Sequence, residues 1–252
     1  MKSKSNLGQN FLIDTKIVDK IVCLSGIGKE DLVYEVGTGT GILTKRLCKI
    51  SKFVRSFELD SKIYEQSKRL LKYDNLELSN LDGLNEKSNI QFDVFFSSLP
   101  YYESRRALSW LCQRQFHRAI ILLQREFVEK LLSKPGDRNY RAISILSQYR
   151  FSITPLLKVP PSSFSPKPKV DSLLVELSPK VSPLSLQVIN DVQFLFSFRK
   201  KTVSFVLNYF NNHCKDNLDR SAISDIASIR IAQLSPSQIL WLNDFLKNNL
   251  FI

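Results

Sequence analysis

The feature that most constrains this chain is a glycine loop that directly follows an apolar run. Residues 32–36 are predicted to form a buried strand, after which Gly37, Gly39 and Gly41 alternate with threonines. Glycine lacks a Cβ and adopts positive φ at little cost, so such a loop lets the backbone approach a ligand closely. A dinucleotide-binding loop would need glycine at position 42, where this sequence has Ile42. The loop therefore favours a ligand without a pyrophosphate.

Strand-like and helical patterns alternate through the first two thirds of the sequence. A helix is expected between Asp14 and Gly26, because Asp14 suits a helix N-cap and apolar residues follow it at helical spacing. Further helices are expected over 42–48, 61–72 and 105–112, and further strands over 53–57, 76–78, 93–97, 119–123, 156–159 and 173–177. This alternation is typical of an α/β fold with a parallel sheet covered on both faces.

The pattern changes after the last of these strands. Pro179 and Pro183 interrupt the chain, and the apolar residues beyond them recur mainly at helical spacing. Helices are expected over 184–196, 202–210, 221–226 and 236–246. We therefore divide the sequence into an α/β domain, residues 1–182, and a small all-helical domain, residues 183–252.

Acidic residues follow two of the predicted strands. Glu58 comes directly after strand 53–57, and Asp82 follows strand 76–78. Parallel strands end at one edge of their sheet, so both acids are expected beside the glycine loop. Glu58 can accept hydrogen bonds from both hydroxyls of a ribose there, and Asp82 can accept one from an adenine amino group. Each acid alone would pass for a solvated loop residue, but together with the loop they indicate an adenosine ligand such as S-adenosylmethionine.

The end of strand 93–97 brings a fourth segment, residues 98–101, to the same edge. Pro100 has no N–H and must end the strand, so Tyr101 is expected to project towards the ligand. Phe164 lies in a second loop, which is rich in proline. This loop is expected to be stiff, because the proline ring restricts φ. Two rings on rigid loops beside a cofactor can hold a flipped-out base between them. The alternative is that both rings belong to the core.

The net charge of +12 indicates a polyanionic partner, most simply a nucleic acid. Residues 105–150 hold ten Arg or Lys against three Asp or Glu, and residues 199–201 form a second basic cluster. A solvated basic surface is the alternative for either cluster taken alone.

The remaining composition bears on location. The longest apolar run is far shorter than a membrane span, and the polar start leads into no apolar signal core. The four cysteines are scattered and the two histidines form no zinc-binding pattern with them, which is typical of buried thiols in a reducing compartment. We therefore expect a cytoplasmic chain with no metal site and no membrane partner.

Six segments in order resemble the motifs of the ribosomal RNA adenine dimethylase family (KsgA-type enzymes). They lie at residues 7–12, 35–41, 57–60, 81–83, 164–172 and 198–202 and cover nearly the whole chain. The resemblance implies a Rossmann-like class I S-adenosylmethionine-dependent methyltransferase domain, a small helical domain, and a monomer. The implied reaction is dimethylation of two adjacent adenosines near the 3′ end of small-subunit ribosomal RNA, in the immature small ribosomal subunit.

The same resemblance assigns roles to individual residues. Those expected to bind the methyl donor are Gln9, Asn10, Leu12, Gly37, Gly39, Glu58, Asp82 and Ser98. Those expected at the reacting base are Ser98, Leu99, Pro100, Tyr101 and Phe164. From the two basic clusters, those expected to contact RNA are Arg105, Arg106, Arg138, Arg141, Arg199, Lys200 and Lys201.

One position departs from the family pattern. The catalytic motif of the family begins with Asn or Asp, whereas this chain has Ser98. In the family, the amide oxygen and the backbone carbonyl at the position of Pro100 accept hydrogen bonds from the adenine amine and aim its lone pair at the methyl group. A serine hydroxyl also accepts but is shorter, and losing one transition-state hydrogen bond slows a reaction roughly 100- to 1000-fold. Three interpretations therefore stay open: a working dimethylase, a non-catalytic ribosome-assembly factor that binds ribosomal RNA, and a DNA-binding relative of the transcription-factor type.

Overall fold

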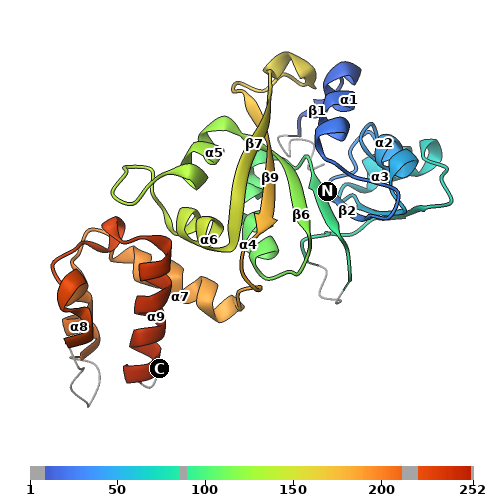
Figure 1. Cartoon of the computed structure of the whole chain (residues 1–252). Coiled ribbons are helices and arrows are strands. Elements are labelled where there is room, and N and C mark those ends of the chain that lie inside the picture. Colours follow the sequence, from blue (N-terminus) through green and yellow to red (C-terminus); the bar gives the residue numbers. More distant parts are fainter. Residues whose placement is uncertain (1–8, 86–89, 212–220, 251–252) are drawn as a thin grey trace, which may run out of the picture. The chain divides into compact units, whose positions relative to one another are not determined.

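The computed structural model describes residues 9–85, 90–211 and 221–250, and in these residues seven strands form one sheet (Figure 1). The strand order is β4-β3-β2-β5-β6-β9-β7. The strands are β2 (Leu32–Val36), β3 (Phe53–Phe57), β4 (Leu76–Ser79), β5 (Val94–Ser97), β6 (Arg118–Gln124), β7 (Phe151–Val159) and β9 (Ser172–Pro179). Strands β2 to β6 run parallel to one another, so the carboxyl ends of β2, β3, β4 and β5 meet at one edge.

The sheet is mixed rather than all parallel, which corrects the expectation from the sequence. Strand β9 is antiparallel to both of its neighbours, β6 and β7. The reason lies in the connections: β7 returns to β9 through a loop without a crossover helix, and a direct return of this kind pairs antiparallel. The α/β class itself is as expected.

The helices around this sheet begin and end close to the predicted limits. They are α1 (Thr15–Leu24), α2 (Thr44–Ile50), α3 (Ser61–Leu70) and α4 (Ser104–Cys112), with a single 3-10 turn, η1 (Tyr101–Glu103), before α4. Asp14 caps α1, because its carboxylate accepts from the backbone N–H groups of Lys16 and Ile17. Asp60 caps α3 in the same way. The caps fix the points at which the chain leaves the sheet edge.

Both faces of the sheet are buried by alternate residues of the same strands. Val33 and Val94 belong to a core cluster with residues of α1 and α2. Their strand neighbours Tyr34 and Phe95 point the other way, where their rings lie 5.4 Å and 5.8 Å from that of Trp110 on α4. Side chains alternate between faces along a strand, so continuously apolar strands of this kind need cover on both sides.

A second, two-stranded sheet holds the start of the described chain. Strand β1 (Phe11–Leu12) pairs antiparallel with β8 (Phe164–Ser165), with Leu12 opposite Phe164. Asn10 and Phe164 are thereby brought to the same part of the molecule although they lie far apart in the sequence.

The chain divides into two compact units, and the division is discontinuous. One unit holds residues 1–128 and 151–180, and the other holds residues 129–150 and 181–252. Segment 129–150 therefore groups with the C-terminal helices, whereas the sequence assigned it to the first domain. The boundary between residues 182 and 183 stays a prediction.

The second unit is helical in its described part. It contains the end of α5 (Arg125–Leu132), then α6 (Ala142–Arg150), α7 (Leu186–Ser197), α8 (Val203–Asn211), α9 (Pro236–Leu250) and the short turns η3 (Ser221–Ile226) and η4 (Ile231–Gln233). Tyr140 anchors its core, with its ring edge-on to Phe196 at 5.7 Å and its hydroxyl donating to the Leu234 carbonyl at 3.1 Å. No helix of the described residues is long and apolar enough to cross a membrane.

Candidate functional site

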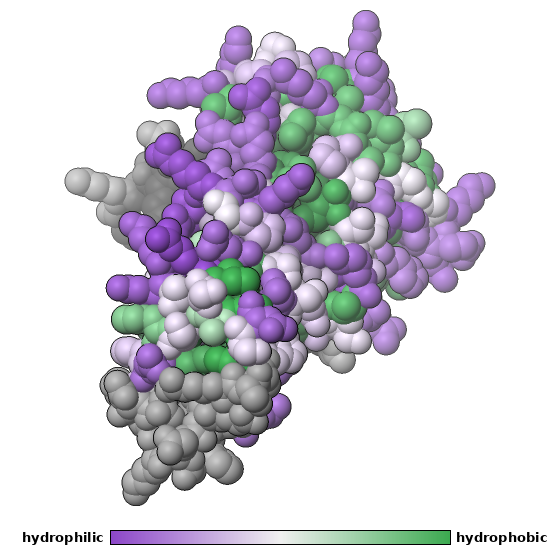
Figure 2. All heavy atoms as spheres, turned by 60° about the vertical axis from the view of Figure 1, so that its left-hand side comes forward, coloured by the Kyte–Doolittle hydropathy of each residue, from purple (hydrophilic) through white to green (hydrophobic). Residues whose placement is uncertain are grey.

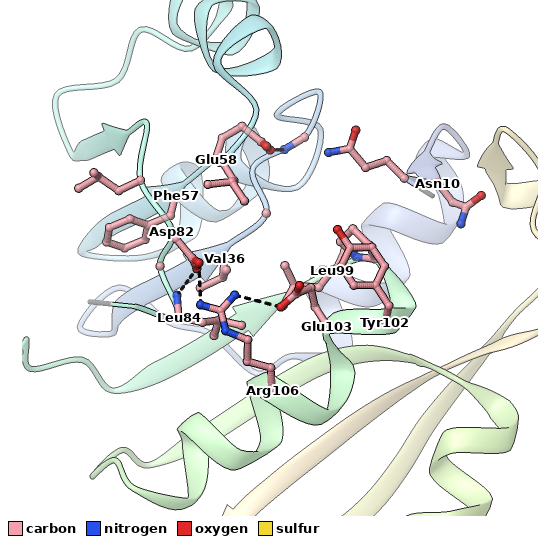
Figure 3. Close-up of a pocket in the computed structure, with 18 of the residues that line it drawn as sticks. Asn10, Val36, Phe57, Glu58, Asp82, Leu84, Leu99, Tyr102, Glu103 and Arg106 are labelled. Carbon is pink, nitrogen blue, oxygen red and sulfur yellow. Dashed lines mark hydrogen bonds and ion pairs between the residues drawn. The ribbon is translucent and has the colours of Figure 1, made fainter. Parts of the chain in front are cut away.

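A pocket lies at the carboxyl edge of the parallel strands, in the first unit (Figure 3). It encloses about 720 Å³ of free space, part of which is open to solvent. Nine of the residues predicted to bind the donor or the reacting base line it, namely Gln9, Asn10, Gly37, Gly39, Glu58, Asp82, Ser98, Leu99 and Pro100. Five separate segments of the sequence therefore meet around one space, four of them at the sheet edge and one just before β1.

The glycine loop and Glu58 form one wall of the pocket. Gly37 and Gly39 adopt φ angles of 91° and 55°, which side-chain-bearing residues rarely adopt. The backbone N–H of Gly39 donates to Oε2 of Glu58 at 2.9 Å, and that of Asp60 donates to Oε1 at 2.9 Å. Burial raises the pKa of Glu58, while the two N–H groups oppose that rise. The N–H of Leu59 contributes a third hydrogen bond to this carboxylate. A carboxylate has about four acceptor positions, so one remains that can face the pocket.

Asp82 and Arg106 form the opposite wall. Oδ1 of Asp82 accepts from the backbone N–H of Leu84 at 3.0 Å, and Oδ2 accepts from Nη2 of Arg106 at 2.6 Å. Nη1 of Arg106 also donates to Oε2 of Glu103 at 3.1 Å (Figure 3). Partial burial opposes the charge of Arg106, but the hydrogen bonds and charges of the two carboxylates outweigh it and raise the pKa of the guanidinium.

This position of Arg106 differs from the role expected from the sequence. Arg106 and Arg105 are adjacent and were both assigned to an RNA-binding surface, but Arg105 is exposed and Arg106 is partly buried. Arg106 instead lies within the pocket, with its guanidinium committed to two acids. The spacing of Glu103 and Arg106, three residues apart at the start of a helix, is the one sequence signal that could have indicated the contact.

A second, smaller pocket adjoins the first and encloses about 220 Å³ of free space. Its lining residues are Asn10, Ser98, Leu99, Pro100, Tyr101, Leu122 and Phe164. Four of these, Asn10, Ser98, Leu99 and Pro100, also line the larger pocket. The two spaces therefore share a common wall, built from the end of β5 and the residue before β1.

The glycine loop contacts that shared wall closely. A Cβ placed on Gly37 would lie 3.3 Å from a methyl carbon of Leu99 and 3.8 Å from the carbonyl oxygen of Ser98. Pro100 carries no N–H, and its carbonyl accepts from the N–H of Glu103 at 2.9 Å, which leaves one lone pair on that oxygen. Ser97, the residue before the wall, is turned away, because its hydroxyl donates to the Val36 carbonyl at 3.0 Å.

The two aromatic rings singled out in the sequence meet in the smaller pocket. Tyr101 is half-buried, and its hydroxyl lies 2.7 Å from that of Ser172. Burial raises the pKa of the Tyr101 phenol, so the ring stays neutral at physiological pH. Phe164 is 5% exposed and belongs to the hydrophobic core cluster as well as to the pocket wall. Phe164 thus combines the structural and the pocket-lining positions that the sequence presented as alternatives.

Some predicted donor-site residues lie elsewhere, and some lining residues were missed. Leu12 lines neither pocket: it is 4% exposed and faces the core, because its strand neighbour Phe11 takes the pocket side. Leu7 and Gly8 of the opening motif lie outside the described residues. Six further lining residues lie within the recognised motifs but were given no role of their own: Phe11, Val36, Phe57, Leu59, Leu81 and Gly83. Three lie outside every motif: Leu84, Tyr102 and Glu103. Most of them supply apolar surface and backbone, which carry no chemical signal in the sequence, whereas Glu103 supplies a carboxylate that pairs with Arg106.

The remaining basic residues singled out in the sequence belong to the second unit. Arg138, Lys200 and Lys201 are exposed, and Arg199 is half-exposed. The pKa of Arg141 is lowered, first by partial burial and then by the nearby charges of Arg199 and Arg138. Segments 138–141 and 199–201, which are distant in sequence, therefore contribute to one positively charged surface within this unit. In Figure 2 the molecule is turned so that the left-hand side of Figure 1 comes forward. On this face, hydrophilic side chains surround smaller hydrophobic areas.

Comparisons with known proteins match this chain over nearly its full length. The model of the family described as ribosomal RNA adenine dimethylase matches residues 1–247. A probable ribosomal RNA small subunit methyltransferase A of Thermococcus gammatolerans is 32% identical, covering 99% of this chain and 91% of its own. A dimethyladenosine transferase structure from Plasmodium falciparum superimposes with a TM-score of 0.80 at 29% identity, covering 95% and 98% of the two chains. The 23S rRNA methyltransferase ErmE, 22% identical over 94% of this chain and 100% of its own, shares the fold with a TM-score of 0.64.

Proposed function

Because this chain belongs to the ribosomal RNA adenine dimethylase family, whose methyl donor is S-adenosylmethionine, we propose that it dimethylates two adjacent adenosines near the 3′ end of small-subunit ribosomal RNA. The immature small ribosomal subunit is its partner, and the reaction takes place during small-subunit biogenesis. The observation that carries the proposal is the shared wall. Ser98, Leu99 and Pro100 lie between a pocket lined by the acids Glu58 and Asp82 and one lined by two aromatic rings.

The larger pocket fits the methyl donor. Glu58 presents a free acceptor position to the hydroxyls of a ribose, and Asp82 presents acceptor positions to the amino group of an adenine. Gly37 and Gly39 leave space where a side chain would intrude: a Cβ on Gly39 would lie 3.2 Å from the ring of Phe11. When bound, S-adenosylmethionine supplies an electrophilic methyl group on its sulfonium.

The residues of the shared wall are placed to act on the nucleophile. The lone pair of an adenine amine is delocalised into the ring, so the amine attacks only when acceptors draw its hydrogens out of the ring plane. The Ser98 hydroxyl and the Pro100 carbonyl are acceptors at this wall. Tyr101 and Phe164 present aromatic surface to a base that has left its stack, and stacking is worth roughly 1–3 kcal/mol per base.

Transfer of a labelled methyl group to unmodified small ribosomal subunits tests the proposal. We expect incorporation that approaches four methyls per subunit, two on each of two adenosines. A Ser98→Asn variant belongs beside the native chain, since it restores the amide of the family motif. Comparable rates would mean that the serine hydroxyl supports the chemistry.

The assembly-factor alternative predicts a different pair of results. It rests on one observation, that Ser98 is shorter than the asparagine of the family motif and leaves the amine with a weaker acceptor. A native chain that binds donor and subunits but transfers no methyl, beside a Ser98→Asn variant that gains a large activity, would establish a binding factor. If neither the native chain nor the Ser98→Asn variant bound S-adenosylmethionine, the proposed methyltransferase function itself would be contradicted.

A further inference from the structure

Arg106 is the one basic residue among the described residues that line the larger pocket. It lies in the first turn of α4 and reaches back across the pocket to the loop that follows β4. Its Nη2 donates to Oδ2 of Asp82 at 2.6 Å and to Oδ1 of Asn85 at 2.9 Å, while Nη1 donates to Oε2 of Glu103 at 3.1 Å. The guanidinium thus spans three acceptors on two separate segments (Figure 3).

The arrangement holds the carboxylate of Asp82 in one orientation. Its Oδ1 accepts from the N–H of Leu84 and its Oδ2 accepts from the guanidinium, so each oxygen holds one donor and retains a second acceptor position. An ionised carboxylate only accepts hydrogen bonds, whereas a protonated one can also donate. Arg106 therefore fixes the direction in which the carboxylate oxygens of Asp82 face the pocket.

We propose that Arg106 is a positioning residue that makes the donor pocket selective for a 6-aminopurine over a 6-oxopurine. The inference rests on the proposed donor site and identifies a residue that tunes it. The amino group of adenine can donate a hydrogen bond to the Asp82 carboxylate. The 6-oxygen of hypoxanthine cannot donate, and its negative partial charge is repelled by the carboxylate. A site built to hydrogen-bond one group rejects an analogue that leaves its buried polar atoms unpaired.

The forked shape of the guanidinium explains why a positive charge alone would not hold Asp82 in place. Asp82 and Glu103 would repel each other if left unpaired, and a planar fork satisfies both at once with fixed geometry. Lysine carries the same charge on a flexible stem without that fork. Charge and geometry can therefore be separated by substitution.

Binding of two ligands that do not react tests the proposal. S-adenosylhomocysteine and S-inosylhomocysteine differ in the purine, which carries an amino group in the first and an oxygen in the second. Calorimetry gives the dissociation constant of each for the native chain and for Arg106→Gln, Arg106→Lys and Arg105→Gln. Arg105→Gln is the matched control, because it removes the same charge from the neighbouring exposed position on the same helix.

For Arg106→Gln we expect affinity for S-adenosylhomocysteine to fall about tenfold, and its preference over S-inosylhomocysteine to narrow by a similar factor. Arg106→Lys should keep only part of the native preference for S-adenosylhomocysteine. Arg105→Gln should bind both ligands with the affinities of the native chain. The proposal is overturned if the preference in Arg106→Gln is unchanged, or if S-adenosylhomocysteine binds more tightly, which would make Arg106 a competitor for Asp82. A native chain that binds neither ligand would instead contradict the proposed donor site. Thermal unfolding of each variant confirms that a folded protein is compared.

Discussion

The hydroxyl of Ser56 on β3 donates to the buried carboxylate of Glu35 on β2 at 2.6 Å. Thr44 of α2 donates to the same oxygen at 2.7 Å, so the strand before the glycine loop is joined to the helix after it. Glu35 is 1% exposed, and burial raises its pKa to about 7, against the opposing effect of the two hydroxyls. The strand that leads into the glycine loop therefore contains a buried carboxyl group with a pKa of about 7.

This raised pKa predicts a pH-dependent stability. The folded state binds the Glu35 proton more tightly than the unfolded state, so protonation of Glu35 stabilises the fold. This contribution to the free energy of unfolding is fully present below pH about 4.5 and is lost as the pH rises through about 7. Glu35→Gln cannot titrate and keeps a similar shape. The free energy of unfolding of this variant, relative to the native chain, should rise by about 2–3 kcal/mol between pH 5 and pH 8.

Urea unfolding of both proteins at the two pH values measures that difference. Exposed Glu30 provides the control, because Glu30→Gln removes the same charge without a buried site. A relative stability of Glu35→Gln that does not change with pH would show that Glu35 titrates in its ordinary range.

Gly83 makes a second prediction, since it carries the Asp82 loop over the sheet. A Cβ at this position would lie 2.9 Å from Cγ of Phe57 and 2.9 Å from Cγ2 of Val36, both on buried strands that have little room to move. Gly83→Ala should therefore displace the loop and lower the free energy of unfolding by about 1–3 kcal/mol. Affinity for S-adenosylhomocysteine should fall with it, because Asp82 moves.

Gly28→Ala is the matched substitution, since nothing lies within 4 Å of a Cβ there. Thermal unfolding and calorimetry on both variants decide the matter. Equal stability and equal affinity in the two variants would mean that the loop adapts without cost.

The parts of the fold that the sequence predicts well are those with a strong local pattern. Strands β2 and β3 have the predicted limits, because each is a short run rich in β-branched and aromatic residues and bounded by turn residues. Helices α5 and α6 were not predicted. In α6 the polar residues Ser144, Ser147 and Arg150 are buried along with the apolar ones, so no exposed polar face marks the helix.

The pocket shows a similar division. Glycines and acids at strand ends have a recognisable spacing, and the structure gathers them at one edge. Arg105 and Arg106 look alike in the sequence, and only the rotation of α4 decides which of them reaches Asp82. A contact between distant segments of this kind depends on packing that no local pattern encodes.

Tyr101 supplies a third prediction, because its ring and its hydroxyl can be removed separately. Tyr101→Phe keeps the ring in the smaller pocket and loses only the contact with Ser172, so methyl transfer should stay near the native rate. Tyr101→Ala also loses the stacking surface and should slow transfer roughly 10- to 100-fold. Affinity for S-adenosylhomocysteine should be unchanged in both, since Tyr101 does not line the larger pocket. Equal turnover of the Ala variant and the native chain would make the ring purely structural.

The basic surface of the second unit gives the last prediction. Arg138 and Arg199 belong to the cluster around Arg141, so each is expected to neutralise an RNA phosphate. The double variant Arg138→Gln, Arg199→Gln should weaken RNA binding and reduce the slope of log affinity against log salt by about 1.5, because two fewer counterions are released.

Exposed Lys45 and Lys49 on α2 give a control of equal charge, and Lys45→Gln, Lys49→Gln should leave the slope unchanged. Titrations of a small-subunit ribosomal RNA hairpin and of duplex DNA at the same salt concentrations supply both comparisons. An unaltered slope in the arginine variant would place the RNA on another surface, and tighter binding of the DNA by the native chain would favour the transcription-factor type of relative over a ribosomal RNA enzyme.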